Sequence, residues 1–92
     1  MPTFVLSHEA ETDIAGISDY IAKHNITAAI KMLDLIQEAC QTLAENPGLG
    51  EVRKGYGVPD CRSFTVSHYV VFFRPNGNGI DVARILDASR DL

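Results

Sequence analysis

The sequence has no long apolar run and no excess of positive charge. None of its hydrophobic stretches approaches the roughly 20 residues that a helix needs to cross a bilayer, so no membrane span is predicted. Eight Lys and Arg against twelve Asp and Glu give a net charge of -4. That balance argues against the broad basic footprint by which proteins bind nucleic acid, and leaves only a local basic patch as an open alternative.

Cysteine is also scarce, which bears on metal binding and on compartment. Cys40 and Cys61 form no CxxC pair, and no His lies at zinc-ligand spacing from them. We interpret them as buried or half-buried free thiols in a reducing cytosol, and we expect no metal site and no cofactor. The opening residues "MPTFVLSHEAETD" lack a basic region before the apolar one. No signal peptide is expected, and the predicted location is cytoplasmic.

The hydrophobic pattern predicts one domain over residues 1–92 with the element order β-α-α-β-β-β. A chain of 92 residues, 46% of them hydrophobic, has the size and composition of a single globular domain. The predicted strands cover residues 3–6, 61–67, 69–74 and 80–86, and the predicted helices cover residues 8 to about 23 and 28–46. Ser7 and Thr27 are the expected N-caps, with His24 and Asn25 as the stop between the helices. Residues 51–60 lack a period and are expected to form a loop.

The two helices are expected to pair and to cover one face of a sheet. Ile14, Ile17 and Ile21 recur at helical spacing along the first helix. The short link to the second helix predicts an antiparallel hairpin, whose broad apolar face needs a sheet to cover it. The predicted fold class is therefore α+β, an antiparallel sheet with an α-helical hairpin packed on one face.

The second face of the predicted sheet is expected to stay partly open. The segment 69–74 is apolar on both faces, as a central strand would be. Two helices cannot cover all of the apolar strand residues, among them Val70, Phe72, Val82 and Ile85. Some apolar surface should therefore remain for another molecule.

Four segments, taken in order, resemble a known family. They are "LSHEAETDIAGISDYIA", "LAENPGLGEVR", "CRSFTVSHYVVFFR" and "IDVARILDASRDL". Together they are similar to the ParE branch of the RelE/ParE superfamily of bacterial toxins, over nearly the whole chain. The resemblance implies the toxin half of a toxin–antitoxin pair. It also implies a cognate, ParD-like antitoxin that folds on binding, a hetero-oligomer of the two, and DNA gyrase as the target.

The related RelE branch cleaves mRNA in the ribosomal A site, and that activity is the main alternative. Attack by a 2′-hydroxyl needs a general base, a general acid and cations on the phosphate. RelE-like nucleases tend to place a Tyr or His near the C-terminus, where this chain has "DASRDL", with Asp87 at the position of that His. His68 and Glu51 are possible substitutes without an identified partner. We therefore expect no catalytic residues and a non-catalytic inhibitor.

A second alternative is a member that binds its antitoxin without being toxic. The chain ends at Leu92, directly after "RD", whereas relatives often run a few residues further. A tail that matters for toxicity in some relatives is therefore expected to be short here, which keeps this alternative open.

The predicted contact residues for the antitoxin or the target are mostly arginines. They are Arg53, Tyr56, Arg62, Tyr69, Arg74, Arg84 and Arg90. Arg74 and Arg84 are expected to lie close across neighbouring strands, where like charges need acidic partners. The acids that could pair with arginines inside the fold are Asp13, Asp60, Asp81 and Asp91. The alternative role is to anchor an acidic, partly disordered antitoxin on strand 69–74 and the helical hairpin, and both roles can hold together.

Overall fold

The computed structural model describes residues 1–55, 57 and 59–89. Tyr56, Arg90 and Asp91, which the sequence analysis singled out, lie outside the described residues. The elements in chain order are β1 (Phe4–Leu6), α1 (His8–Ala22), α2 (Ile26–Glu45), a 3₁₀ turn η1 (Pro47–Leu49), β2 (Glu51–Val52), β3 (Arg62–Val66), β4 (Tyr69–Asn76) and β5 (Gly79–Asp87). Among the described residues, neither helix combines the length and the apolar character that crossing a membrane requires.

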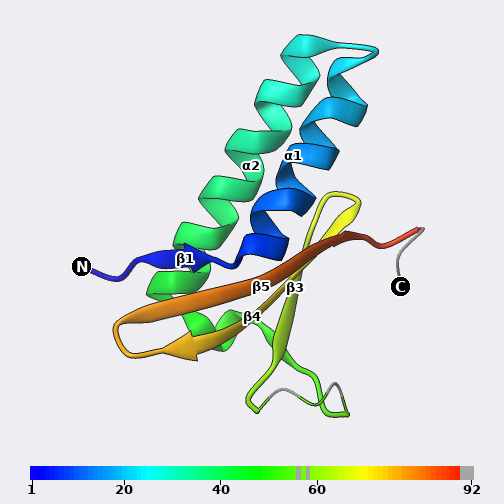
Figure 1. Cartoon of the computed structure of the whole chain (residues 1–92). Helices are drawn as coiled ribbons and strands as arrows, with labels where there is room; N and C mark the ends of the chain where they lie inside the picture. The colour runs from blue at the N-terminus through cyan, green and yellow to red at the C-terminus, as the bar shows by residue number, and fades with distance from the viewer. Residues whose placement is uncertain (56, 58, 90–92) are drawn as a thin grey trace.

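The strands form one sheet in the order β1-β5-β4-β3-β2. The predicted α+β class is confirmed, and so is the helical hairpin on one face (Figure 1). The sheet is mixed, however, because β1 runs parallel to β5 while the other pairs are antiparallel. A hydrophobic pattern identifies a strand without its direction, so the sequence did not reveal this. The predicted loop 51–60 also contains β2, whose two residues are too few to show a period.

Each helix begins at a side-chain cap. The Ser7 hydroxyl oxygen accepts a hydrogen bond from the Ala10 amide at 3.0 Å, as predicted. The second prediction was wrong, because Asn25 caps α2 in place of Thr27. The Asn25 side-chain oxygen accepts from the Ala28 amide at 3.0 Å, and its extended backbone lets the helix begin at Ile26. The link between the helices is therefore only residues 23–25, which keeps α1 and α2 antiparallel neighbours.

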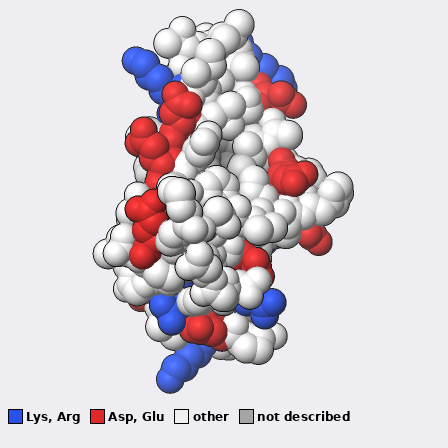
Figure 2. All heavy atoms as spheres, turned by 90° about the vertical axis from the view of Figure 1, so that its left-hand side faces the viewer, with Lys and Arg blue, Asp and Glu red and all other residues white. Residues whose placement is uncertain are grey.

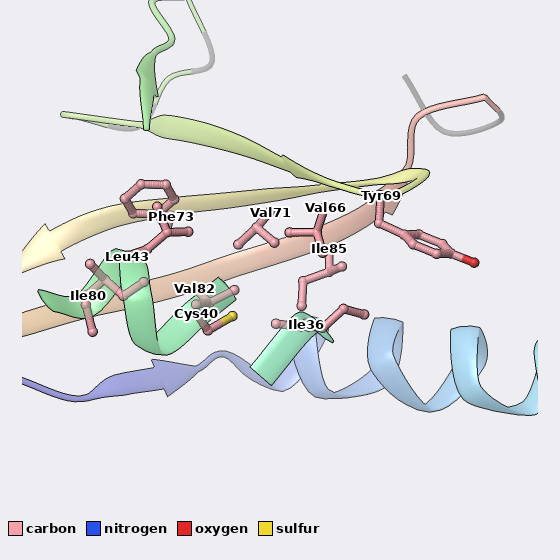
Figure 3. Packing of buried hydrophobic residues seen from close by; sticks show 12 residues of the cluster. Ile36, Cys40, Leu43, Val66, Tyr69, Val71, Phe73, Ile80, Val82 and Ile85 are labelled. Atoms are coloured by element: carbon pink, nitrogen blue, oxygen red, sulfur yellow. The ribbon is translucent and has the colours of Figure 1, made fainter. Parts of the chain in front are cut away.

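The main core lies between the sheet and the helices (Figure 3). Its most deeply buried side chains are Ile36, Cys40, Leu43, Val71, Phe73, Ile80, Val82 and Ile85. Alternate residues of β4 supply the sheet side, since Tyr69, Val71 and Phe73 belong to this cluster. Both cysteines are free and buried, as predicted.

The second face of the sheet is less open than the sequence suggested. Of the four apolar strand residues considered in the sequence, Val82 and Ile85 belong to the core under the helices. Val70 and Phe72 do face the other side, but they are only 6% and 8% exposed. They form a small second cluster with Cys61, against which Leu86 packs. These four residues therefore leave little apolar surface for a partner.

Candidate functional site

Four of the predicted contact arginines are described, and each is paired with a carboxylate of the same chain. The pairs are Arg84 with Asp13 at 2.8 Å, Arg62 with Asp60 at 3.2 Å, Arg53 with Glu51 at 3.4 Å, and Arg74 with Asp81 at 3.7 Å. Three of the four acids proposed from the sequence thus fill the expected role. Each of these four arginines therefore has its charge balanced by a carboxylate within the fold.

The pair of Arg84 and Asp13 fastens α1 to β5. Arg84 Nε and Nη2 donate to the two Asp13 oxygens at 2.8 and 2.9 Å, and the Ile85 amide donates to Asp13 at 2.9 Å. Burial alone would raise the pKa of Asp13, but the bonds from Arg84 and Ile85 outweigh it and leave the pKa below its ordinary value of 3.8. This two-pronged pair between a guanidinium and a carboxylate joins the sheet to α1.

A β-bulge precedes this fork. The pairing of β4 with β5 passes from Phe73 opposite Val82 to Phe72 opposite Arg84, which leaves Ala83 without a counterpart. The Ser7 hydroxyl donates to the Ala83 carbonyl at 2.7 Å. The start of α1 is therefore held at the bulge by Ser7 and, nearly two turns later, at β5 by Asp13.

Arg74 and Arg84 are not opposite one another, which corrects the expected proximity. Arg74 lies opposite Asp81, and Arg84 lies opposite Phe72. The bulge at Ala83 shifts the register between the row of Arg74 and the row of Arg84. Each of the two guanidinium groups is paired with a different carboxylate. The repulsion expected between facing like charges therefore does not arise.

Arg53 and Arg62 hold the segment between η1 and β3. Arg53 Nε donates to the Ser63 hydroxyl at 2.7 Å, and Arg62 Nη1 donates to the Pro47 carbonyl at 3.0 Å. Burial raises the pKa of the neighbouring Cys61, an effect that the charge of Arg53 partly opposes. These two arginines act as ties within the fold.

The candidate proton-transfer residues of a ribonuclease do not converge. Glu51 lies opposite Ser63 on the outer strand β2, whereas His68 is exposed in the turn after Val66. Along β3, Ser63, which lies opposite Glu51, is about 10 Å from Val66, the last residue before the turn that holds His68. The Asp87 carboxylate accepts hydrogen bonds from the Ser89 amide and hydroxyl at 2.9 and 2.6 Å. Glu51 and His68, the two possible substitutes, are therefore not brought together beside the arginines.

Two neighbouring hollows lie between residues of α2 and residues of β1, and we call the two together the α2–β1 groove. Their volumes are about 330 and 260 Å³, and Phe4 and Gln37 line both. The other lining residues are Leu6, Ile14, Leu33, Asp34, Ile36, Glu38, Cys40 and Gln41. Figure 2 shows this side of the molecule, where an uncharged strip runs between acidic side chains.

A third hollow lies beside α1, and we call it the α1 groove. Its volume is about 410 Å³, and it is lined by Thr12, Asp13, Gly16, Ile17, Asp19, Tyr20, Lys23, Tyr69, Ile85 and Asp87. Tyr69 is the one predicted contact residue in this lining among those described, and only 6% of it is exposed. β4 lies between β3 and β5, so segment 69–74 is a central strand, as predicted, and it offers no edge to a partner.

Sequence reasoning missed both grooves. The α1 groove had one weak signal in Gly16, a glycine inside a predicted helix.

Comparisons with known proteins agree with this architecture. The sequence model of one family, described as the ParE toxin of the type II toxin–antitoxin system parDE, matches residues 4–92. A solved structure described as the chromosomal ParDE TA system from P. aeruginosa superposes with a TM-score of 0.72. It is 26% identical and is matched over 92% of this chain and 94% of its own. No curated protein matches the sequence.

Proposed function

We propose that this chain, which belongs to the ParE toxin family of type II toxin–antitoxin systems, acts by inhibiting DNA gyrase without catalysing a reaction. Membership makes it a toxin with a cognate antitoxin partner. Gyrase is the target that the resemblance to ParE toxins implies. The mode of action and the antitoxin surface are argued below from the side chains.

The pairing of the arginines is the observation that carries the non-catalytic mode. A ribonuclease of this fold would need guanidinium groups gathered on one phosphate, with an acid and a base beside them. Here the described sheet arginines are each paired with a carboxylate, and Glu51 and His68 lie in different parts of the sheet. A protein that acts by binding alone has no need of that convergence.

The α2–β1 groove is the surface that best suits the antitoxin. Part of its lining is apolar, with Phe4, Leu6 and Leu33 along it. β1 forms an outer edge of the sheet, so its outward backbone groups can pair with an added strand. An extended or helical segment that folds on binding would bury these side chains and gain affinity from them.

The charge at this groove favours a segment that carries basic side chains. Asp34 and Glu38 line it, and both are exposed on α2. The expectation of an acidic antitoxin rested on arginines as anchors, and the described ones already have carboxylate partners within the chain. We therefore propose basic anchors in the antitoxin segment that enters the groove, whatever the net charge of the rest of that protein.

The target is tested by two assays run on the same purified protein. One measures supercoiling of relaxed plasmid by gyrase, and the other measures cleavage of mRNA on translating ribosomes. We expect inhibition of supercoiling, intact mRNA, and an unchanged effect for His68→Ala. Cut mRNA together with normal supercoiling would show a ribonuclease and refute the proposal.

The antitoxin surface is tested by filling the hollow that Phe4 and Gln37 share. Gln37→Trp should weaken antitoxin binding at least about tenfold, measured by calorimetry. Leu35→Trp is the matched control, because Leu35 is 48% exposed on the same helix and lines neither hollow. Equal affinities for the two variants would place the antitoxin elsewhere.

A further inference from the structure

We infer that the α1 groove docks the target protein, through a segment that brings an arginine or lysine side chain to Asp19 and Tyr20. This inference rests on the proposed role as a target-binding toxin, and it deepens that role by assigning the surface. The α1 groove and the α2–β1 groove use different residues of α1, since only the latter includes Ile14. The two grooves can therefore serve two different proteins.

Gly16 is the first observation that points to an occupant. It lies in the middle of the fifteen-residue helix α1, and a methyl group at its Cα would meet nothing within 4 Å. Packing within the chain therefore does not require a glycine here. Glycine is among the least favourable residues in a helix interior, and one of its structural uses is to allow a close approach between a backbone and a ligand. Its place in the lining of a groove matches that use.

Charge and aromatic character identify the chemistry of the occupant. Asp13, Asp19 and Asp87 line the groove, against Lys23 as the one cation among the described lining residues. Asp13 is already paired with Arg84. Asp19 is exposed and forms no ion pair with another described residue. Tyr20, 51% exposed, is its neighbour in sequence and lines the same groove. A carboxylate beside an exposed ring suits a guanidinium or an ammonium group.

The floor of the groove is preorganised. Tyr69 and Ile85 line it and are 6% and 1% exposed, as members of the main core. The fork between Asp13 and Arg84 fixes this part of α1 against β5. A partner that docks here therefore does not have to order the surface first, which favours binding.

Two pairs of variants test the inference. Gly16→Leu fills the groove and Asp19→Lys reverses its charge, whereas Ala15→Leu and Glu11→Lys make the same changes at exposed α1 residues outside the lining. We expect Gly16→Leu and Asp19→Lys to raise the concentration that half-inhibits gyrase supercoiling at least about tenfold. The two controls should stay within about twofold of the parent. Antitoxin affinity, measured on all four, should also stay within about twofold.

Gly16→Ala supplies a measurement that does not depend on the target. It should raise the melting temperature by about 4 °C, because the helix gains a better residue and no contact is crowded. A lower melting temperature would show that the glycine serves the fold, and would remove the argument for an occupant.

The outcomes separate this inference from the proposed function. If the parent inhibits gyrase and all four variants do so equally well, the docking surface is wrong and the gyrase proposal stands. If the parent arrests growth on expression without inhibiting gyrase, the gyrase proposal is wrong. Growth arrest by the same four variants then decides the docking surface. A parent that does neither would overturn both.

Discussion

The two hydrogen bonds between Arg84 and Asp13 should contribute strongly to the free energy of unfolding. Asp13→Asn keeps the shape of the side chain and removes its charge. A charge-assisted hydrogen bond contributes about 1.5–3 kcal/mol. Because the Arg84 side chain is 47% exposed, we take its two bonds together at about 1.5 kcal/mol. The weakened bond from the Ile85 amide adds about 1 kcal/mol. The free energy of unfolding should therefore fall by about 2–3 kcal/mol, a large part of the stability of a small domain.

Urea unfolding followed by circular dichroism at pH 7 measures this loss. A double-mutant cycle with Arg84→Met isolates the ion pair and should give a coupling of about 1–1.5 kcal/mol. Asp81→Asn is the control, because its contact with Arg74 is long, 3.7 Å, and both side chains are at least one-third exposed. That change should cost less than about 0.5 kcal/mol. Equal losses at Asp13 and Asp81, or a coupling near zero, would refute the reasoning.

The lowered pKa of Asp13 adds a pH dependence with a definite sign. Its carboxylate is favoured in the folded state, so its contribution is fully present above the unfolded pKa, near 3.8. The contribution is lost as the pH falls through the lower folded pKa. The stability difference between the parent and Asp13→Asn should therefore stay constant from pH 7 to about 5 and shrink below about pH 4. A difference that instead grew on acidification would contradict the assignment of the bonds.

The remaining predictions concern the core, the edge strand and the thiols. Phe73→Ala should lower the free energy of unfolding by about 3–5 kcal/mol in urea titrations, because Phe73 is 1% exposed. Gly79→Ala should cost about 1–3 kcal/mol in the same assay, because its methyl group would overlap the Thr3 carbonyl oxygen and push β1 off β5. A parent-like midpoint for Gly79→Ala would contradict that pairing. Burial raises the pKa of Cys40 to about 11, so at pH 8 it should react with a disulfide reagent only as fast as the protein unfolds; rapid reaction in the folded state would show that the thiol is accessible.

Local patterns were sufficient for the class of the fold and for the positions of most elements. The isoleucine stripe and the Ser7 cap each depend on neighbours a few residues apart, and both are present in the structure, where Ile14 and Ile17 pack against the core. Three acids that pair with arginines, Asp13, Asp60 and Asp81, were also identified from the sequence, whereas Glu51, the partner of Arg53, was not. The same patterns missed the Asn25 cap, since Thr27 and Asn25 are both good capping residues and only the backbone decides between them.

What the tertiary structure alone decided concerns long-range pairing. The parallel direction of β1, the bulge at Ala83 and the shift that separates Arg74 from Arg84 come from contacts between segments distant in sequence. The same holds for Val82 and Ile85, whose side of the sheet depends on the register of β5 and not on the apolar run itself. The two grooves arise where α1 and α2 meet the ends and the edge of the sheet. Periodicity along one segment carries no record of which segment lies beside it, so these features were accessible only after the chain was folded.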